Sequence, residues 1–190
     1  LGFLRSFTAT VTMLIISPKL FFDRMHINKG YKLPLIFLII MLTFGNTFNY
    51  IYLSTGLIEH PSKQVAEVME NEPELSAQAQ FFKDMINSEP EPYDIIIGVV
   101  SNLIFFYLMA LYWHFILRSL SVAINGFQAS FRVFCYSSVV LTSSLIPYSS
   151  ASLNLMIYVW WVYLIYRGMS EAHEVSGRIT IRGIMISLFA

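Results

Sequence analysis

The side chains with the greatest chemical reactivity in this 190-residue sequence are four histidines and a single cysteine. The histidines lie far apart, at positions 26, 60, 114 and 173, and no HExxH or comparable metal-ligand spacing joins them. Cys135 has no second cysteine to pair with, so an internal disulfide is excluded. The sequence therefore predicts no catalytic residue, no cofactor and no metal site, and we expect a protein that is not an enzyme.

Polar side chains also recur within otherwise apolar segments. Thr43, Asn46, Thr47 and Tyr50 follow i, i+3, i+4, i+7 spacing, which places them on one side of a helix. In hydrocarbon such groups face either protein or a wet cavity, so they indicate interhelical hydrogen bonds or a transport path. Hydroxyl residues at 137–144 follow small-xxx-small spacing, without a base or acid beside them. The candidate intramembrane polar cluster comprises Thr43, Asn46, Tyr50, Ser138 and Thr142.

Composition and hydropathy indicate the elements that carry these residues. Hydrophobic residues make up 56% of the chain and charged residues 13%, which is typical of a polytopic membrane protein rather than a soluble domain. Four apolar segments, 33–53, 95–117, 131–146 and 151–166, are predicted to be transmembrane spans. The third is short, about 24 Å at 1.5 Å per residue. Residues 179–190 turn apolar again, and we expect them to begin a fifth span. The fold class is therefore an all-α transmembrane helix bundle forming a single domain over 1–190.

The amino-terminal segment differs from these spans because its apolar residues form a stripe. Phe3, Phe7, Val11 and Ile15 recur at helical spacing with polar residues between them, which predicts an amphipathic helix lying in the membrane interface. Ser17 and Pro18 are expected to break it, and basic and aromatic residues suited to lipid headgroups follow.

Residues 54–93 form a hydrophilic, proline-punctuated stretch, for which we predict a loop domain with two short amphipathic helices, at 62–71 and 74–86. Its carboxylates lack metal-ligand spacing, so a solvated acidic face is favoured over a metal site. Nine of the twelve acidic residues lie between Glu59 and Asp94, whereas ten of the twelve basic residues lie elsewhere. The positive-inside rule therefore predicts a cytoplasmic amino terminus and an acidic loop outside the cell.

The segment 154–182 combines an aromatic exit from the membrane with charges that follow it. On a continuing helix, Arg167 and Glu171, and likewise Glu174 and Arg178, are spaced i,i+4 and can form ion pairs. Gly168 is expected to allow close approach of a neighbouring helix, and Gly177 to end the helix. His173 is predicted to be a surface contact rather than a ligand. His114 is predicted to make interfacial hydrogen bonds, a proton-responsive role being the alternative.

Basic residues from this segment and from the stretch after Pro18 are predicted to form one cytoplasmic face that docks a protein partner or anionic lipid headgroups. The candidate residues are Lys19, Arg24, Arg167 and Arg178.

Three stretches carry a resemblance to the Yip (Ypt-interacting protein) domain family of polytopic membrane proteins: SPKLFFDRM from Ser17, GFQASFRVFCYSSVVLTSSLIP from Gly126, and WWVYLIYRGMSEAHEVSGRITIRG from Trp160. The third is most similar to prokaryotic-type members. The resemblance implies five helices and a bacterial cytoplasmic (inner) membrane. Eukaryotic members engage Rab-type GTPases and vesicle coats, but their Asp-Leu-Tyr-Gly-Pro signature does not occur in this sequence. The resemblance therefore transfers no site residue.

Two functions remain open. A non-enzymatic membrane organiser or partner-binding scaffold is favoured by the amphipathic segments and the basic belt, which are surfaces rather than pockets. A small transporter or lipid-handling protein is the alternative, and it would use the polar faces of the first and third spans. The expected partners are the lipid bilayer and a docked protein or headgroup, with an oligomer also foreseen, and no nucleic acid is expected.

Overall fold

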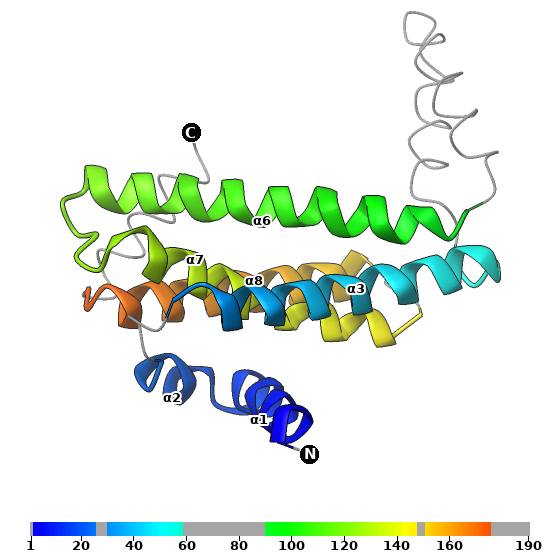
Figure 1. Cartoon of the computed structure of the whole chain (residues 1–190), viewed down its shortest axis with the longest axis horizontal. Coiled ribbons are helices and arrows are strands. Elements are labelled where there is room, and N and C mark those ends of the chain that lie inside the picture. Colours follow the sequence, from blue (N-terminus) through cyan, green and yellow to red (C-terminus); the bar gives the residue numbers. More distant parts are fainter. Residues whose placement is uncertain (1, 26–29, 59–89, 148–150, 176–190) are drawn as a thin grey trace, which may run out of the picture.

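A computed structural model describes residues 2–25, 30–58, 90–147 and 151–175, and within these ranges all regular structure is helical (Figure 1). The predicted all-α fold is therefore confirmed for the described residues. The predicted loop helices and the start of the fifth span lie outside them. The helices are α1 (Gly2–Ile16), α2 (Pro18–Asp23), α3 (Lys32–Ser54), α6 (Tyr93–Ser119), α7 (Gly126–Ser137), the 3₁₀ helix η2 (Ser138–Leu145) and α8 (Ala151–Ala172).

Helices α3 and α6 are long and apolar enough to cross a membrane, with mean hydropathies of 1.6 and 2.2. Pro34 lies in the first turn of α3, where its missing N–H costs no hydrogen bond. Asp94 in the first turn of α6 accepts a 2.8 Å hydrogen bond from the Glu91 N–H. Arg118 lies in the last turn of α6, so an acid at the first turn and a base at the last turn both interact favourably with the helix dipole. Their bounds lie within two residues of the predicted spans.

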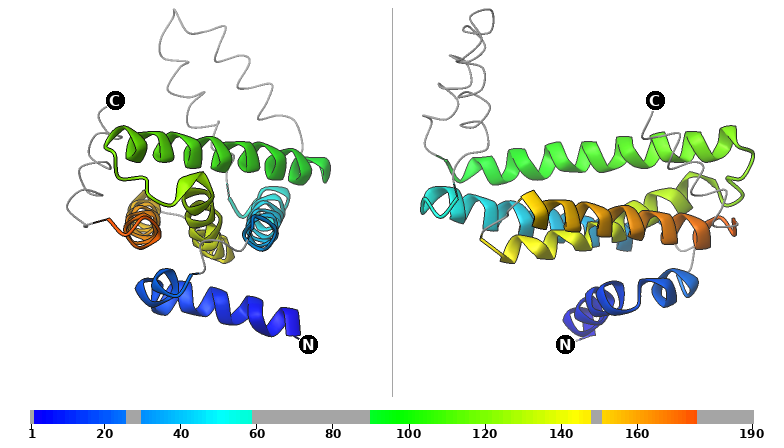
Figure 2. Two further views of the ribbon diagram at one scale, coloured as in Figure 1. Left: turned by 60° about the vertical axis from the view of Figure 1, so that its left-hand side comes forward. Right: turned by 180° about the vertical axis from the view of Figure 1, so that it is seen from behind.

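The helices form three layers. Helix α6 covers one face of a middle layer composed of α3, α7 with η2, and α8, and α1 and α2 cover the opposite face (Figures 1 and 2). Contacts follow this arrangement, because α6 packs on α3 and α7 whereas α2 packs on α8. The core lies around α7, where Val133, Phe134 and Cys135 have no exposed surface.

The third predicted span is one continuous helical rod that changes type at Ser138. It begins at Gly126, five residues before the predicted start, and its second half is a 3₁₀ helix. Hydroxyl groups explain the change, because side chains in this region donate to carbonyls three residues earlier and so favour the tighter turn. These donors are Ser137, Ser138, Thr142 and Ser144. With 2.0 Å of rise per 3₁₀ residue, the rod is about 34 Å long, not about 24 Å.

Helix α8 contains the whole of the predicted fourth span but ends at Ala172, so the expectation that Gly177 ends it is wrong. The chain turns back instead, with Glu174 at a φ of +54°. Two hydrogen bonds close this turn: the Val175 N–H donates to the Ser170 carbonyl at 2.9 Å, and the Ser170 hydroxyl donates to the Val175 carbonyl at 2.7 Å. These bonds satisfy the end of the helix without a glycine.

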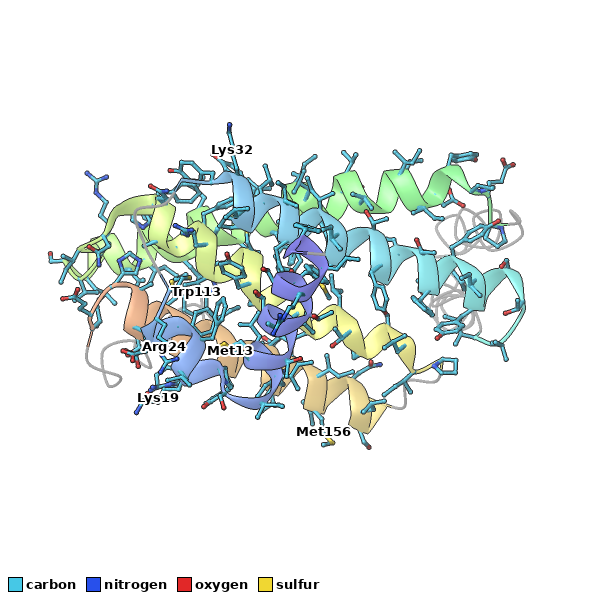
Figure 3. All side chains as sticks on the ribbon, turned by 60° about the horizontal axis from the view of Figure 1, so that its bottom comes forward. Met13, Lys19, Arg24, Lys32, Trp113 and Met156 are labelled. Carbon is cyan, nitrogen blue, oxygen red and sulfur yellow. The ribbon has the colours of Figure 1, made fainter. Side chains whose placement is uncertain are left out.

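Helices α1 and α2 confirm the predicted break at Ser17 and Pro18. Helix α1 does not lie across the end of the bundle but against its side, where it crosses over α3 and η2 (Figure 3). The Phe7 ring packs at a tilt against the Phe37 ring of α3 with ring centroids 5.3 Å apart, and Leu14 is fully buried.

Candidate functional site

The predicted basic face depends on how α2 is held against α8. Gly168 of α8 lies under Phe22 of α2 and Val133 of α7. A Cβ atom at Gly168 would overlap Cγ1 of Val133 and would lie 3.0 and 3.1 Å from two ring atoms of Phe22. Gly168 therefore allows the close approach that the sequence predicted, and Phe22 is only 2% exposed.

Because α2 is held in this way, Lys19 and Arg24 lie beside the last turns of α8 (Figure 3). Both side chains are exposed. Arg167 of α8 is largely covered and forms an ion pair with Glu171, 2.8 Å between Nη2 and Oε1, which confirms the predicted i,i+4 pair. Arg178 lies outside the described residues. The structure thus brings together the exposed side chains of Lys19 and Arg24 and the largely covered Arg167, which pairs with Glu171.

A buried polar network links the ends of α6, α7 and α8, and sequence reasoning did not find it. Its centre is Ser130 of α7, whose Oγ lies 2.9 Å from Nε2 of His173 and 3.0 Å from Nδ1 of His114. Asn125 extends it, because its N–H points at Nδ1 of His173 at 3.4 Å and its side-chain amide donates to the Ala172 carbonyl at 2.8 Å. The prediction that His173 is a surface residue is wrong, since it has no exposed surface.

The donors in this network can be assigned from the backbone. Since the Asn125 N–H donates to Nδ1 of His173, the proton of that neutral ring resides on Nε2, which donates to Ser130. The Ser130 hydroxyl then donates to Nδ1 of His114, in line with the hydrogen bonding predicted for His114. Burial, with a smaller effect from the nearby His114 ring, lowers the pKa of His173 to about 4. His173 is therefore neutral at pH 7.

The chemistry of this network favours a structural role, in which hydrogen bonds hold the ends of α6, α7 and α8 together, over a reaction centre. Ser130 and His173 are both fully enclosed, so a substrate has no access to the hydroxyl. Within the described ranges no three His, Cys, Asp or Glu side chains are placed to hold a metal ion. The hydrogen-bonded partners are separated by 16 to 48 positions in the sequence, so no local motif marks the network.

The structure divides the predicted intramembrane polar cluster among four places. Asn46 and Tyr50 line a pocket of about 290 Å³ with Asp94, between the C-terminal half of α3 and the start of α6. Thr142 lines a different pocket, beneath α1. Ser138 is fully buried and donates to the Cys135 carbonyl at 2.6 Å, and Thr43 is exposed on the side of α3.

Asn46 shows how the polar groups of α3 and α6 are accommodated. Its amide donates to the Leu42 carbonyl of its own helix at 2.8 Å, and its oxygen lies against Gly98 of α6. Asn102 similarly donates to the Gly98 carbonyl at 2.8 Å. Both side chains satisfy their N–H groups within one helix, which leaves Gly98 as the point of close interhelical approach.

Comparison with protein-family models matches residues 12–190 to the Yip1 domain. The chain belongs to the Yip1 domain family. No curated protein and no solved structure matches it. Yip1-domain proteins are membrane proteins and are not known as an enzyme family, which agrees with the two described helices that are able to cross a bilayer. The lipid bilayer is therefore the environment of this Yip1-domain protein.

Proposed function

We propose that this Yip1-domain protein is a non-enzymatic membrane scaffold whose α2–α8 face, defined as Lys19, Arg24 and Arg167, docks an anionic surface on the cytoplasmic side. The observation that supports this is the seating of Phe22 over Gly168, which fixes two exposed bases beside the end of α8. A held pair of bases binds anionic headgroups or an acidic protein segment with a smaller entropy cost than bases on a mobile tail.

The acidic neighbours of the face limit its strength. Glu171 neutralises much of Arg167, and Asp23 lies on α2 between the two exposed bases. Binding is expected to weaken as the salt concentration rises from about 0.05 to about 0.5 M in a titration, because exposed charges are screened within about 10 Å at 0.1 M.

Charge reversal tests the face. In nanodiscs, native mass spectrometry would count retained phosphatidylglycerol against phosphatidylcholine for Lys19→Glu combined with Arg24→Glu. Lys32→Glu combined with Arg118→Glu makes the same change in net charge, and Lys32 lies at the opposite edge of the molecule (Figure 3). We expect the first pair to lose the preference for phosphatidylglycerol and the second pair to keep it. Equal retention in both would contradict the proposed face.

A photo-crosslinking amino acid at Lys19 in native membranes separates the two kinds of partner. A discrete protein adduct supports a docked protein, whereas a lipid adduct supports headgroup binding. If the photo-activated side chain reacts only with water and forms neither adduct, the result argues against a scaffold that acts through this face.

The proposed topology has four spans and a fifth beyond α8, in a bacterial inner membrane, with the amino terminus in the cytoplasm and the acidic loop outside. Support comes from the distribution of Lys and Arg along the chain. A cysteine placed at Ser76 should react with an impermeant maleimide in intact cells, and one at Ser176 should not. The native Cys135 is buried and should not interfere. The reverse pattern would invert the topology and move the α2–α8 face outside the cell.

A transporter or lipid-handling role is the second candidate, and the pocket lined by Asn46, Tyr50 and Asp94 favours it. Ser138 is not among the residues that line this pocket, so a path to the bilayer centre is not continuous there. A cysteine at Asn46 that reacts from outside, with one at Ser138 unreactive, supports a shallow pocket. Reaction at both positions supports a pathway and disfavours the scaffold.

A further inference from the structure

The position of α1 along α3 defines how deep α1 lies. One flank of α1 lines a pocket with Leu33, Ile36 and Phe37 of α3, and its other flank lines a pocket with Met41 and Phe44. At a rise of 1.5 Å per residue, these α3 residues lie from about 2 to about 18 Å from Lys32 along the axis of α3, and the middle of this range is about 10 Å from Lys32. A helix at headgroup level would contact only the first turn of α3, whereas half of the hydrocarbon core is about 15 Å thick.

Apart from Arg5 near one end, the large side chains on the outward surface of α1 are apolar, and Ser6, Thr8 and Thr12 are exposed among them. Its exposed side chains include Phe3 at 57%, Leu4 at 67% and Ile16 at 73%. The segment between Arg5 and Lys19 contains no charged residue, so both bases lie at the ends, from which their long side chains can reach headgroups. The surface also continues onto exposed apolar residues of α3 such as Ile36 and Ile39.

Three of the four hydroxyl groups of α1 donate to carbonyls of the same helix. Ser6 donates to the Gly2 carbonyl at 2.9 Å, Thr8 donates to the Leu4 carbonyl at 3.0 Å, and Thr10 donates to the Ser6 carbonyl at 2.9 Å. A hydroxyl that is satisfied within its own helix can enter hydrocarbon at little cost, because the cost arises from polar groups left without partners.

Two backbone hydrogen bonds connect the break between α1 and α2. The Ser17 N–H donates to the Met13 carbonyl at 2.8 Å, Pro18 has no N–H, and the Phe21 N–H donates to the Ser17 carbonyl at 3.1 Å. Non-helical backbone is tolerated at membrane depth where it is buried in protein, and Pro18 is buried.

We propose that α1 lies flat within the acyl-chain region of the leaflet that contains Lys32, and that its outward face binds lipid acyl chains. This position is deeper than the interface plane predicted from the amphipathic pattern. The deeper position follows from the packing of α1 on α3 and η2, which the sequence alone does not reveal. The inference requires α3 to cross the membrane and does not depend on the α2–α8 face.

Spin-label depth measurements on the full chain in liposomes test this. Single cysteines would be placed at Ala9, an exposed position of α1, and at Ile39, a lipid-exposed position of α3, with Cys135 replaced by Ala. Lys19 and Lys32 supply headgroup references. Collision rates with oxygen and with a nickel chelate give the depth of each label. We expect the Ala9 label to match the Ile39 label and to lie about 10 Å deeper than the Lys32 label.

Three outcomes would overturn the proposal. Nickel access at Ala9 equal to that at Lys32 would place α1 at the surface. Protection of Ala9 from both reagents would show that protein, such as a second copy of the chain, covers α1. Nickel access at Ile39 would show that α3 does not cross the membrane. A label at Ile16, which is 73% exposed, repeats the measurement if the Ala9 variant melts below the parent.

Discussion

Replacement of Gly168 by Ala tests whether α2 is held against α8 as the structure describes. The added Cβ would overlap Cγ1 of Val133 and would lie 3.0 Å from Cε1 of Phe22, against an ordinary carbon–carbon contact of about 3.5–4.0 Å. Val133 belongs to the buried helix α7, so its rotamer must change or α8 must move away from α7, and the 3.0 Å contact also displaces Phe22 and with it α2. Overpacking of this severity costs about 2–3 kcal/mol.

The higher helix propensity of Ala offsets about 1 kcal/mol of that cost. The net expectation for Gly168→Ala is therefore a loss of about 1–2 kcal/mol in the free energy of unfolding, or a Tm lowered by about 2–8 °C for a chain of this size. The same shift of α2 should move Lys19 and Arg24 and lower phosphatidylglycerol retention. Thermal unfolding in detergent and native mass spectrometry measure the two effects.

Two variants make the test specific. Gly45→Ala is the matched control, because its Cβ would meet Leu141 at 3.4 Å, which is close to ordinary contact, and we expect a change within about 1 kcal/mol of zero. Val133→Ala removes the overlapping methyl, so the double variant with Gly168→Ala should show a favourable coupling energy of about 1 kcal/mol or more. A Gly168→Ala protein as stable as Gly45→Ala, with no coupling to Val133, would refute the close approach.

Three other substitutions follow from contacts at Gly98, Ser138 and His173. Gly98→Ala would drive a Cβ into the Asn46 oxygen, so we expect a loss of about 1–3 kcal/mol that Asn46→Ala relieves, measured by thermal unfolding. Ser138→Leu should cost about 1–3 kcal/mol by overpacking while Ser138→Ala changes little, and equal melting of the two would contradict the burial. The pKa of His173 is about 4 in the folded state, against an ordinary value of 6.5, so the unfolded state binds more protons between these values. Lowering the pH from 7.5 to 5 should therefore reduce the free energy of unfolding by about 2 kcal/mol. His173→Gln should flatten that part of the pH dependence.

The long apolar helices could be predicted because hydropathy and length determine them without reference to partners. Gly168 and the Arg167–Glu171 pair were also predictable, since each depends on one helix and its spacing. The 3₁₀ helix could not be found in this way, because its tighter turn arises from hydroxyls that bond to nearby carbonyls, whereas the small-xxx-small pattern indicated only packing. The end of α8 was also missed, since side-chain closure at Ser170 replaces the expected glycine.

Some polar side chains of the helices form hydrogen bonds within one helix, whereas others form hydrogen bonds between helices. Only the second kind indicates where helices are held together. Asn46, Asn102 and the hydroxyls of η2 bond to carbonyls of their own helices, so they cost little to bury and give no information about a ligand. The network at Ser130 differs, because its hydrogen bonds cross between three helices and would be lost if the ends of α6, α7 and α8 separated. That network fixes the end of α8, and the seat of Phe22 over Gly168 lies only one turn away. Because the two lie so close, we expect protonation of His173 to lower phosphatidylglycerol retention by the α2–α8 face, and retention that does not change with pH would show that the network and the face are independent.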